Sequence, residues 1–291
     1  MMVKQSFIQW GLRILLLVGL TAEAKIAEPQ IQEVQHSEEQ TYTFGIVPQQ
    51  SASRLAALWT PIMQYLSEQT GLNIQFSTAP NIPVFEQRLA AGEYDFAYMN
   101  PYHFTVFHQE PGYHALAKGK NKQIKGILVV HKDSDITALE QLDQHTLAFP
   151  APAAFAASIL TRSYLSEIGV DFTAKYVSSH DSVYSTVAKG LYPAGGGVIR
   201  TFNNIPEAVR NQLRVLWTTQ GYTPHAFAAH PDVNIEDQQK LQHALIQMEY
   251  TLNGVALLQS IKLKGIETAK SSDWDDVRGL KIELLEDLVH P

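Results

Sequence analysis

ILVVHK (residues 127–132) and RVLWTT (residues 214–219) are the two stretches that decide the fold of this chain. Each is a short run rich in β-branched, aliphatic or aromatic residues, which favours a buried strand. The residues between them alternate strand-like and helix-like segments, so they form a complete α/β unit. In the simplest topology, the chain therefore enters a second lobe after residues 127–132 and returns to the first lobe with residues 214–219.

The residues before this pair alternate in the same way, beginning with the strand-like TYTFGIV (residues 41–47). Apolar residues then recur at helical spacing, at Leu55, Leu58, Ile62 and Leu66. Gly71 stands where a C-cap glycine belongs. Thr60-Pro61 resembles an N-cap with a first-turn proline, so this stretch is either one helix or two pieces joined at a bend.

The chain after the second run predicts a largely helical C-terminal piece, with helices over 237–248, 254–261 and 274–288. The whole pattern is that of two α/β units on parallel sheets. Ligand pockets favour the boundary between such units and the carboxyl ends of parallel strands. We therefore expect the binding site in a cleft between two lobes.

The first 24 residues have the layout of a secretory signal peptide. Basic residues precede an apolar run at 14–20, and small residues ending at Ala24 form an A-x-A cleavage site. The apolar run is far shorter than the ~20 residues that span a bilayer. We expect cleavage after Ala24, followed by a flexible polar leader over 25–40.

Composition limits the possible functions and settings of the chain. Its 291 residues are 45% hydrophobic, enough for a sizeable core in one large or two ordinary domains. The absence of cysteine excludes disulfides and a lipid-modified N-terminus, so we expect a periplasmic protein that is not a lipoprotein. With a net charge of −7 and no Lys/Arg runs, the chain has no footprint for nucleic acid or an anionic membrane.

Several segments, spread over nearly all of the chain after residue 40, carry a family resemblance. They are FGIVPQQ (44–50), WTPIMQYLSEQTGLNIQF (59–76), AAGEYDFAYMNPYHF (90–104), ILVVHKDSDITALEQLDQHTLAFPAP (127–152) and SSHDSVYSTVAKG (178–190) with GGGVIRT (195–201). In this order and spacing they resemble the periplasmic phosphate-, phosphite- and phosphonate-binding proteins of ABC transporters.

The resemblance implies an α/β, two-lobed type II periplasmic binding protein fold, each lobe a mostly parallel sheet flanked by helices, with the ligand cleft between the lobes. We place the first lobe at 41–132 with 220–291 and the second at 133–219. The resemblance also implies a monomeric substrate-binding component of an importer, which captures a small molecule by lobe closure for a membrane permease. It implies no enzymatic activity, cofactor or metal.

Two other functions would use the same cleft. A sensory protein would present its closed form to a membrane sensor kinase. A carrier of an apolar or lipid-like ligand is suggested by Phe155 and its alanine-rich turn. A hydrolase or metalloenzyme is disfavoured, because the chain has neither a G-x-S-x-G elbow nor an H-E-x-x-H motif.

AFPAPAAFAAS (148–158) predicts a strand end, a proline turn and a helix start whose unpaired amides can seat an anion. In the resembled family, Ser/Thr hydroxyls hold the phosphonate oxygens at the positions of Ala154, Phe155 and Ala156. Here hydroxyls come only further along, beginning with Ser158. The backbone donors remain, whereas Phe155 and the alanines suit an apolar moiety; alternatively, the alanines only pack against the sheet.

DFAYMNPYHF (95–104) predicts a strand that ends at Asn100 and a helix that restarts at the following proline. Tyr98, Asn100 and Tyr102 would then face the cleft mouth. Tyrosine offers a flat apolar face with a polar tip, and asparagine both donates and accepts hydrogen bonds. The alternatives are a core Tyr98 and an Asn100 that only caps the helix.

SSHDS (178–182) predicts another turn from a strand into a helix, with Ser179, His180 and Asp181 at its tip. The resembled family has a histidine with an acidic neighbour here. His180 can donate to an anion, while Asp181 can fix its tautomer or cap the helix.

GGGVIRT (195–201) brings three glycines into a strand, which indicates close approach of another backbone or of a ligand. Arg200 at its end either forks onto an oxyanion in the cleft or lies at the surface. In QGYTPHAF (220–227), His225 replaces an acidic residue of the resembled family, which argues against an aminoalkyl ligand. Tyr222 adds a ring to the same wall.

Overall fold

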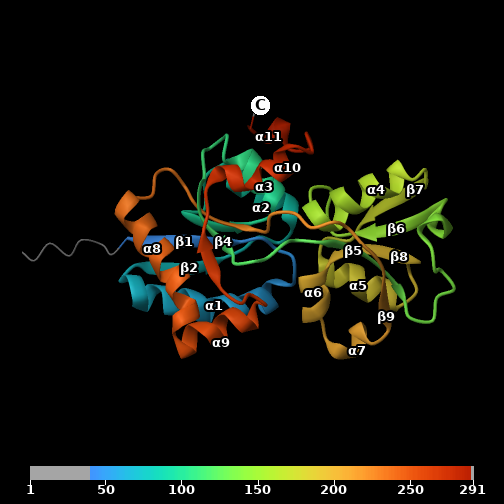
Figure 1. Cartoon of the computed structure of the whole chain (residues 1–291), viewed down its shortest axis with the longest axis horizontal. Coiled ribbons are helices and arrows are strands. Elements are labelled where there is room, and N and C mark those ends of the chain that lie inside the picture. The colour runs from blue at the N-terminus through green and yellow to red at the C-terminus, as the bar shows by residue number, and fades with distance from the viewer. Residues whose placement is uncertain (1–39, 290–291) are drawn as a thin grey trace, which may run out of the picture. The chain divides into compact units, whose positions relative to one another are not determined.

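The computed structural model of this protein describes residues 40–289. The expected signal peptide and residues 25–39 of the expected leader lie outside the described residues. Two β-sheets, each flanked by helices, make up the described part (Figure 1). Within 40–289, no helix combines the length and apolar character needed to cross a membrane.

The first sheet has six strands in the order β11-β4-β10-β3-β1-β2. Their bounds are β1 Thr41–Ile46, β2 Asn73–Ser77, β3 Phe96–Met99, β4 His114–Gly119, β10 Ala226–Ala229 and β11 Ile266–Thr268. β1 runs parallel to β2 and β3, whereas β10 is antiparallel to β3 and β4, and β11 is antiparallel to β4.

The helices of this first lobe come from both ends of the described chain. They are α1 Ala52–Thr70, α2 Ile82–Ala90, α3 Pro101–Phe107, α8 Ile235–Gln247, η3 Met248–Tyr250, α9 Leu252–Ser260, η4 Ser271–Trp274, α10 Asp275–Arg278 and α11 Glu286–Val289. Helix α1 runs through Pro61, so the single-helix alternative is correct, and Gly71 caps it with a left-handed φ of 72°. The helix expected over 274–288 is wrong, because Lys281 adopts a left-handed φ of 50° and the chain is not helical again until α11.

The second sheet has five strands in the order β7-β6-β8-β5-β9. They are β5 Gly126–His131, β6 His145–Phe149, β7 Phe172–Tyr176, β8 Ala194–Val198 and β9 Leu213–Thr218. The accompanying helical elements are η1 Leu139–Leu142, the π-helical turn η2 Phe155–Leu160, α4 Thr161–Glu167, α5 His180–Ala188, α6 Ile199–Asn204 and α7 Glu207–Arg210.

The two-lobed α/β class is confirmed, but the expectation of mostly parallel sheets is wrong. In the second sheet, β6 is parallel to β7 and β8, while β5 is antiparallel to β8 and β9. The strands at the crossings explain this mixture. β5 carries the chain into the second lobe and β9 carries it back, so these neighbours must run in opposite directions.

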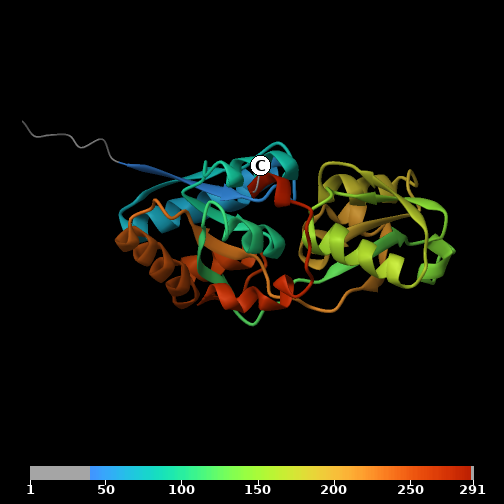
Figure 2. The ribbon, with the colours of Figure 1, turned by 90° about the horizontal axis from the view of Figure 1, so that it is seen from above.

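The chain passes between the sheets in two connections, which run side by side in Figures 1 and 2. One leads from β4 to β5 and the other from β9 to β10. β5 pairs within the second sheet, although the expected boundary at 132 assigns it to the first lobe. We therefore propose lobe boundaries within residues 120–125 and 219–225.

The glycine run of β8 fits closely under the elements that cover it. A Cβ on Gly196 would collide with the carbonyl oxygen of Ala157, and one on Gly126 in β5 with that of Ala156. Gly197 is packed in the same way against the Tyr184 ring. The expected close approach of another backbone is therefore confirmed, and it seats the η2 turn directly on the second sheet.

Candidate functional site

Two cavities lie where the lobes meet, and residues of both lobes line each of them. The inner cavity measures about 10 Å³ and is lined by Val47, Gln49, Ile82, Asn100, Ile124, Ala154, Phe155, Ala156, Ala157, His180 and Val198. The outer pocket measures about 120 Å³ and is lined by Tyr98, Gly119, Lys122, Gln123, Ile124, Lys125, Val198, Ile199, Arg200, Pro224, His225 and Leu263. They share Ile124 and Val198, so they are neighbouring parts of one cleft.

The η2 turn forms the second-lobe wall of the inner cavity. Ala154 and Ala156 line it with almost fully buried side chains, as does Phe155, which meets the Tyr222 ring edge-on at 5.6 Å. Ser158 is buried without a hydrogen-bond partner for its Oγ in the described residues, but it lines neither cavity. The inner cavity therefore receives apolar groups from this turn, and the first expected hydroxyl lies behind it.

Asn100 connects the lobes across the inner cavity and also caps a helix. Its Oδ1 accepts from the backbone N of His103 at 2.8 Å, which caps α3, and its Nδ2 donates to the Ala153 carbonyl at 3.3 Å. The expected cleft position and the alternative capping role are thus both present in one side chain.

His180 faces the inner cavity from the first turn of α5. Its backbone N donates to the Gln49 carbonyl of the first lobe at 3.1 Å. Its ring is 1% exposed, with Nδ1 3.4 Å from Thr201 Oγ1. Burial and the charge of Arg200 lower the pKa of His180 to about 3, so the imidazole is neutral at pH 7.

Ser179 and Asp181 have different roles from the one expected for a ligand site. Ser179 caps α5 by accepting from the backbone N of Ser182 at 3.1 Å. Asp181 accepts from the backbone N of Ser51 at 3.3 Å and lines a surface pocket outside the two cavities. Burial raises the pKa of the Asp181 carboxyl. It therefore bridges the lobes beside the cleft and does not orient His180.

The outer pocket is built around Tyr98, His225 and Arg200. The Tyr98 and His225 rings stack with centroids 4.9 Å apart, and the Arg200 guanidinium carbon lies 5.6 Å from the Tyr98 centroid. Arg200 also donates to Oε1 of Gln49 in the first lobe. Burial holds the pKa of His225 well below its usual range, and the charge of Arg200 lowers it further. The Nε2 of this buried, neutral ring has no hydrogen-bond partner in the described residues.

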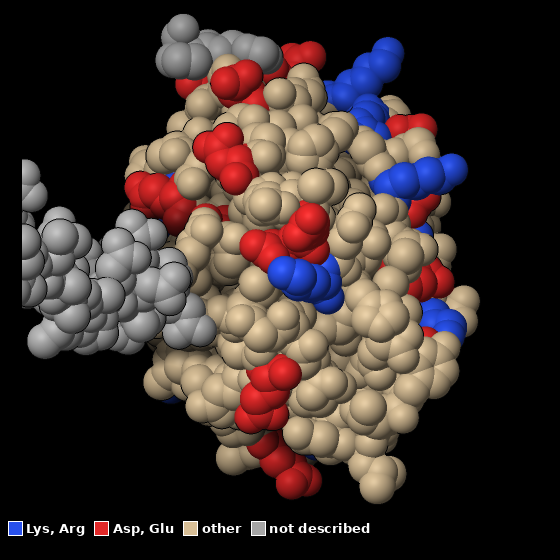
Figure 3. Space-filling model, turned by 90° about the vertical axis from the view of Figure 1, so that its left-hand side faces the viewer, with Lys and Arg blue, Asp and Glu red and all other residues tan. Residues whose placement is uncertain are grey.

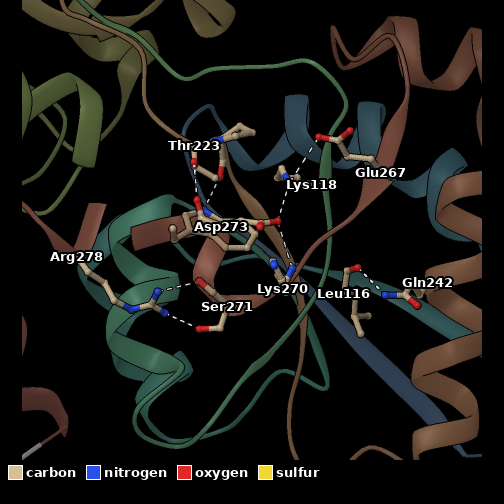
Figure 4. Close-up of polar contacts among 11 residues, drawn as sticks. Leu116, Lys118, Thr223, Gln242, Glu267, Lys270, Ser271, Asp273 and Arg278 are labelled. Carbon is tan, nitrogen blue, oxygen red and sulfur yellow. Dashed lines mark hydrogen bonds and ion pairs between the residues drawn. The ribbon is translucent and has the colours of Figure 1, made fainter. Parts of the chain in front are cut away.

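The loop that carries His225 is hydrogen-bonded to the C-terminal part of the first lobe, as Figure 4 shows for Thr223 and Asp273. Thr223 Oγ1 donates to the Asp273 carbonyl at 2.8 Å, and Trp274 Nε1 donates to the Pro224 carbonyl at 2.8 Å. The Asp273 carboxylate in turn pairs with Lys118 of β4 at 2.6 Å. These contacts fix the loop, so the position of His225 is set by the first lobe.

The remaining expected site residues lie away from the two cavities. Tyr102 accepts from the backbone N of Leu285 at 3.0 Å and is buried beside the C-terminal segment. Tyr222 supports Phe155 from behind and accepts from Gln220 Nε2 at 2.5 Å. The structure thus brings together in the two cavities Tyr98, Asn100, Ala154, Phe155, Ala156, His180, Arg200 and His225.

Four polar residues that line the cleft were missed from sequence: Gln49, Lys122, Gln123 and Lys125. Gln49 follows the carboxyl end of β1, the position where α/β ligand sites usually lie, and this signal could have identified it. Lys122 and Lys125 lie in the connection from β4 to β5, just before the run that predicts the crossing. Their position at a hinge between lobes was the available signal.

Two mixed sheets joined by paired crossings, with a cleft lined by strand ends and helix starts from both lobes, define a type II periplasmic binding protein. Solved structures of that class are similar to this chain. A binding protein component of an ABC phosphonate transporter from Pseudomonas aeruginosa matches with a TM-score of 0.78 and 17% identity, over 84% of this chain and 86% of that one. PhnD1 of Prochlorococcus marinus in complex with methylphosphonate matches with a TM-score of 0.75 and 18% identity, over 83% and 97%.

Sequence comparison identifies the family. The profile described as "ABC transporter, phosphonate, periplasmic substrate-binding protein" matches residues 44–274, so the chain belongs to this family. The phosphate-import protein PhnD of Mycolicibacterium smegmatis is 21% identical over 234 residues, 72% of this chain and 72% of the relative. The family expected from the sequence motifs is confirmed, and its members are periplasmic substrate-binding components of ABC transporters.

Proposed function

We propose that this protein captures a small phosphonate-class oxyanion in its cleft and delivers it to the membrane permease of an ABC importer. It does so as a monomer and without chemistry on the ligand, after export by a cleaved N-terminal signal and without a lipid anchor. The solved relative with methylphosphonate and the curated phosphate-import relative support this ligand class. Among residues 40–289, those that line the two cavities include no serine, cysteine or carboxylate, which supports binding without catalysis.

The observation that carries the proposal is the position of Arg200. Its guanidinium lines the cleft, where its contacts in the described chain are an uncharged amide oxygen of Gln49 and the ring of Tyr98. No carboxylate of the described residues pairs with it. A planar, permanently charged fork without an anionic partner suits an oxyanion with two adjacent oxygens.

Capture by closure fits the contacts between the lobes. Asn100 bonds to Ala153, His180 to Gln49, and Arg200 to Gln49, so each hydrogen bond joins the first lobe to the second beside a cavity. The inner cavity, at about 10 Å³, holds about one water molecule at most. A ligand that enters it must therefore do so while the lobes are apart, and closure then surrounds it.

The test is the thermal unfolding of the purified mature protein with methylphosphonate, phosphite, phosphate, alkylsulfonates and apolar metabolites. A ligand that binds only the native state stabilises it by RT ln(1 + [L]/Kd), so we expect the melting temperature to rise with methylphosphonate or a close analogue. A rise with apolar compounds alone would overturn the oxyanion proposal and support the apolar-carrier alternative.

A further inference from the structure

We propose that the anionic group of the ligand is held in the outer pocket by Arg200, Lys122 and Lys125, with His225 as a neutral donor. The ligand is then an oxyanion with an uncharged, apolar substituent. This inference rests on the proposed function, because it assigns the binding role within the same cleft. The sequence predicts an anion seat at the η2 turn, and this inference places the anion in a different part of the cleft.

The first support is the charge of the pocket lining. Lys122, Lys125 and Arg200 line the outer pocket, and no acidic residue of the described part of the chain lines it. The chain as a whole carries a net charge of −7, and Figure 3 shows acidic and basic groups interspersed over the end of the first lobe remote from the second sheet. Local accumulation of cations on an acidic protein raises the local concentration of an anionic ligand.

The positive charges at the pocket also repel one another while no anion is present. Burial lowers the pKa of the Lys122 ammonium, and the charges of Arg200 and Lys264 lower it further. Lys122 Nζ donates to the Lys262 carbonyl at 3.2 Å, which keeps the ammonium beside the pocket wall at Leu263. An anion placed among these groups relieves the repulsion and favours the protonated lysine.

The second, independent support is His225. Its side chain lines the pocket and is 3% exposed, yet Nε2 has no partner among the described residues. A buried polar nitrogen without a partner is unfavourable in the unliganded protein. Stacking on Tyr98 fixes the ring, so a proton on Nε2 can be donated to a ligand oxygen without further ordering of this side chain.

The shape and the apolar part of the lining define the substituent. Ile124, Val198, Pro224 and Leu263 contribute apolar surface, and the volume of about 120 Å³ exceeds that of the inner cavity about twelvefold. An aminoalkyl substituent would bring an ammonium among three cations with no carboxylate in the lining to receive it. The pocket therefore selects an alkyl or aryl oxyanion and rejects a zwitterion.

The experiment is isothermal titration of the wild type and of the double variant Lys122→Ala/Lys125→Ala with methylphosphonate, propylphosphonate, methanesulfonate and 2-aminoethylphosphonate. We expect the wild type to bind propylphosphonate at least as tightly as methylphosphonate and to bind the aminoalkyl compound at least tenfold more weakly. We expect the double variant to lose about tenfold in affinity and part of its salt dependence, because two cations at a partly exposed site are removed.

Lys132→Ala is the matched control. Lys125 directly precedes β5 and Lys132 directly follows it, so the two lysines lie at opposite ends of this strand. It removes one exposed charge about 20 Å away at 3.3 Å per residue of strand, so we expect affinity within twofold of the wild type. All three lysines are exposed as whole residues, although the Lys122 ammonium is partly desolvated, so the melting temperatures of the unliganded variants should stay close to that of the wild type and report an intact fold.

The outcomes separate this inference from the proposed function. Wild-type affinity for phosphonates that is unchanged in the double variant overturns the outer-pocket assignment and leaves the proposed function standing. Binding of methanesulfonate alone, lost in the double variant, supports the pocket and overturns the phosphonate class. A wild type that binds none of the four anions overturns both.

Discussion

The inner cavity and the outer pocket of the cleft are neighbours, yet they present opposite chemistry. Ala154, Phe155 and Ala156 reduce the inner cavity to about 10 Å³, and its histidine is fully buried and neutral. The outer pocket has about 120 Å³, three cations and an imidazole nitrogen that has no hydrogen-bond partner within 40–289. One half of the cleft is thus closed by packing and the other is left open and charged.

This difference teaches that closure and recognition are assigned to different groups, except for Arg200, which lines the outer pocket and also bonds to Gln49 of the first lobe. The inner half joins the lobes through backbone carbonyls, as when Asn100 donates to Ala153 and the His180 amide donates to Gln49. Both contacts use uncharged groups, so they say little about ligand charge. The outer half supplies the long-range attraction, because only it carries net charge. Substitutions in the two halves should therefore affect stability and affinity differently.

The largest effect is expected from Gly196→Ala, which acts on the inner half alone. The added methyl would collide with the Ala157 carbonyl, a backbone atom that cannot move without displacing η2. We expect a loss of about 3 kcal/mol in unfolding free energy, at the upper end for overpacking, measured by denaturant titration.

Gly279→Ala is the control for that substitution. Gly279 has a helical φ of −59°, and a Cβ there would meet its nearest neighbour, the Asp275 carbonyl, at an ordinary 3.4 Å. We expect it to be neutral or slightly stabilising. Equal stability of the two variants would show that η2 does not press on β8 in solution.

Arg200→Ala comes next and acts on affinity through the outer half. Removing the guanidinium removes at least one charge-assisted hydrogen bond to the ligand, worth about 1.5–3 kcal/mol, so we expect a Kd at least about 10- to 150-fold higher. Arg200→Lys keeps the charge without the planar fork, so its Kd should lie between those of the wild type and the alanine variant. Titration calorimetry measures both, and an alanine variant that binds like the wild type would remove Arg200 from the site.

The fold could be predicted from sequence because its signals are local and repeated. The strand runs at 127–132 and 214–219 indicated the insertion of one α/β unit into another, and that topology is present. The antiparallel pairing of β5 with β8 and β9 was missed, because pairing direction depends on how distant strands assemble. The sequence also assigned β5 to the first lobe, whereas β5 pairs in the second sheet, because the partners of a strand are not visible in its own residues.

The candidate site was predicted less completely, for a different reason. Helix starts are visible as motifs, which is why the sequence indicates Asn100, His180 and Arg200. Tyr102 and Asn100 stand two residues apart, yet Tyr102 points to Leu285, a contact no local pattern encodes. Lys122 belongs to a connection without periodicity, and only the folded chain places it beside Arg200.

Acidification should lower the free energy of unfolding, because each half of the cleft contains a buried, neutral histidine. The folded-state pKa of His180 is lowered to about 3, below the ordinary value near 6.5. Above pH 6.5 neither state takes up a proton, whereas below it the unfolded chain does and the folded protein does not. Stability should therefore fall as pH drops from about 6.5 towards 3, by about 2 kcal/mol for this group at pH 5.

Denaturant titrations at pH 7 and pH 5 measure this loss. His180→Gln should reduce it, and His225→Gln should do the same, since burial also holds the pKa of His225 well below its usual range. His145→Gln is the control, because that side chain lies on the exposed start of β6. Stability that does not change between the two pH values would mean that both imidazoles are hydrated and the lobes stand apart in solution.

The smallest effect, and the most discriminating, is expected from Ala156→Ser. The substitution places a hydroxyl at the inner cavity, whose volume of about 10 Å³ is close to the minimum for one water-sized group. If the anion reached this turn, the new donor would make a charge-assisted hydrogen bond worth about 1.5–3 kcal/mol, a gain of about 10- to 150-fold in affinity. Because we place the anion among Lys122, Lys125 and Arg200 instead, we expect a change of less than twofold in the Kd for methylphosphonate by calorimetry. A tenfold gain would move the anion to the η2 turn and leave the outer pocket to the substituent.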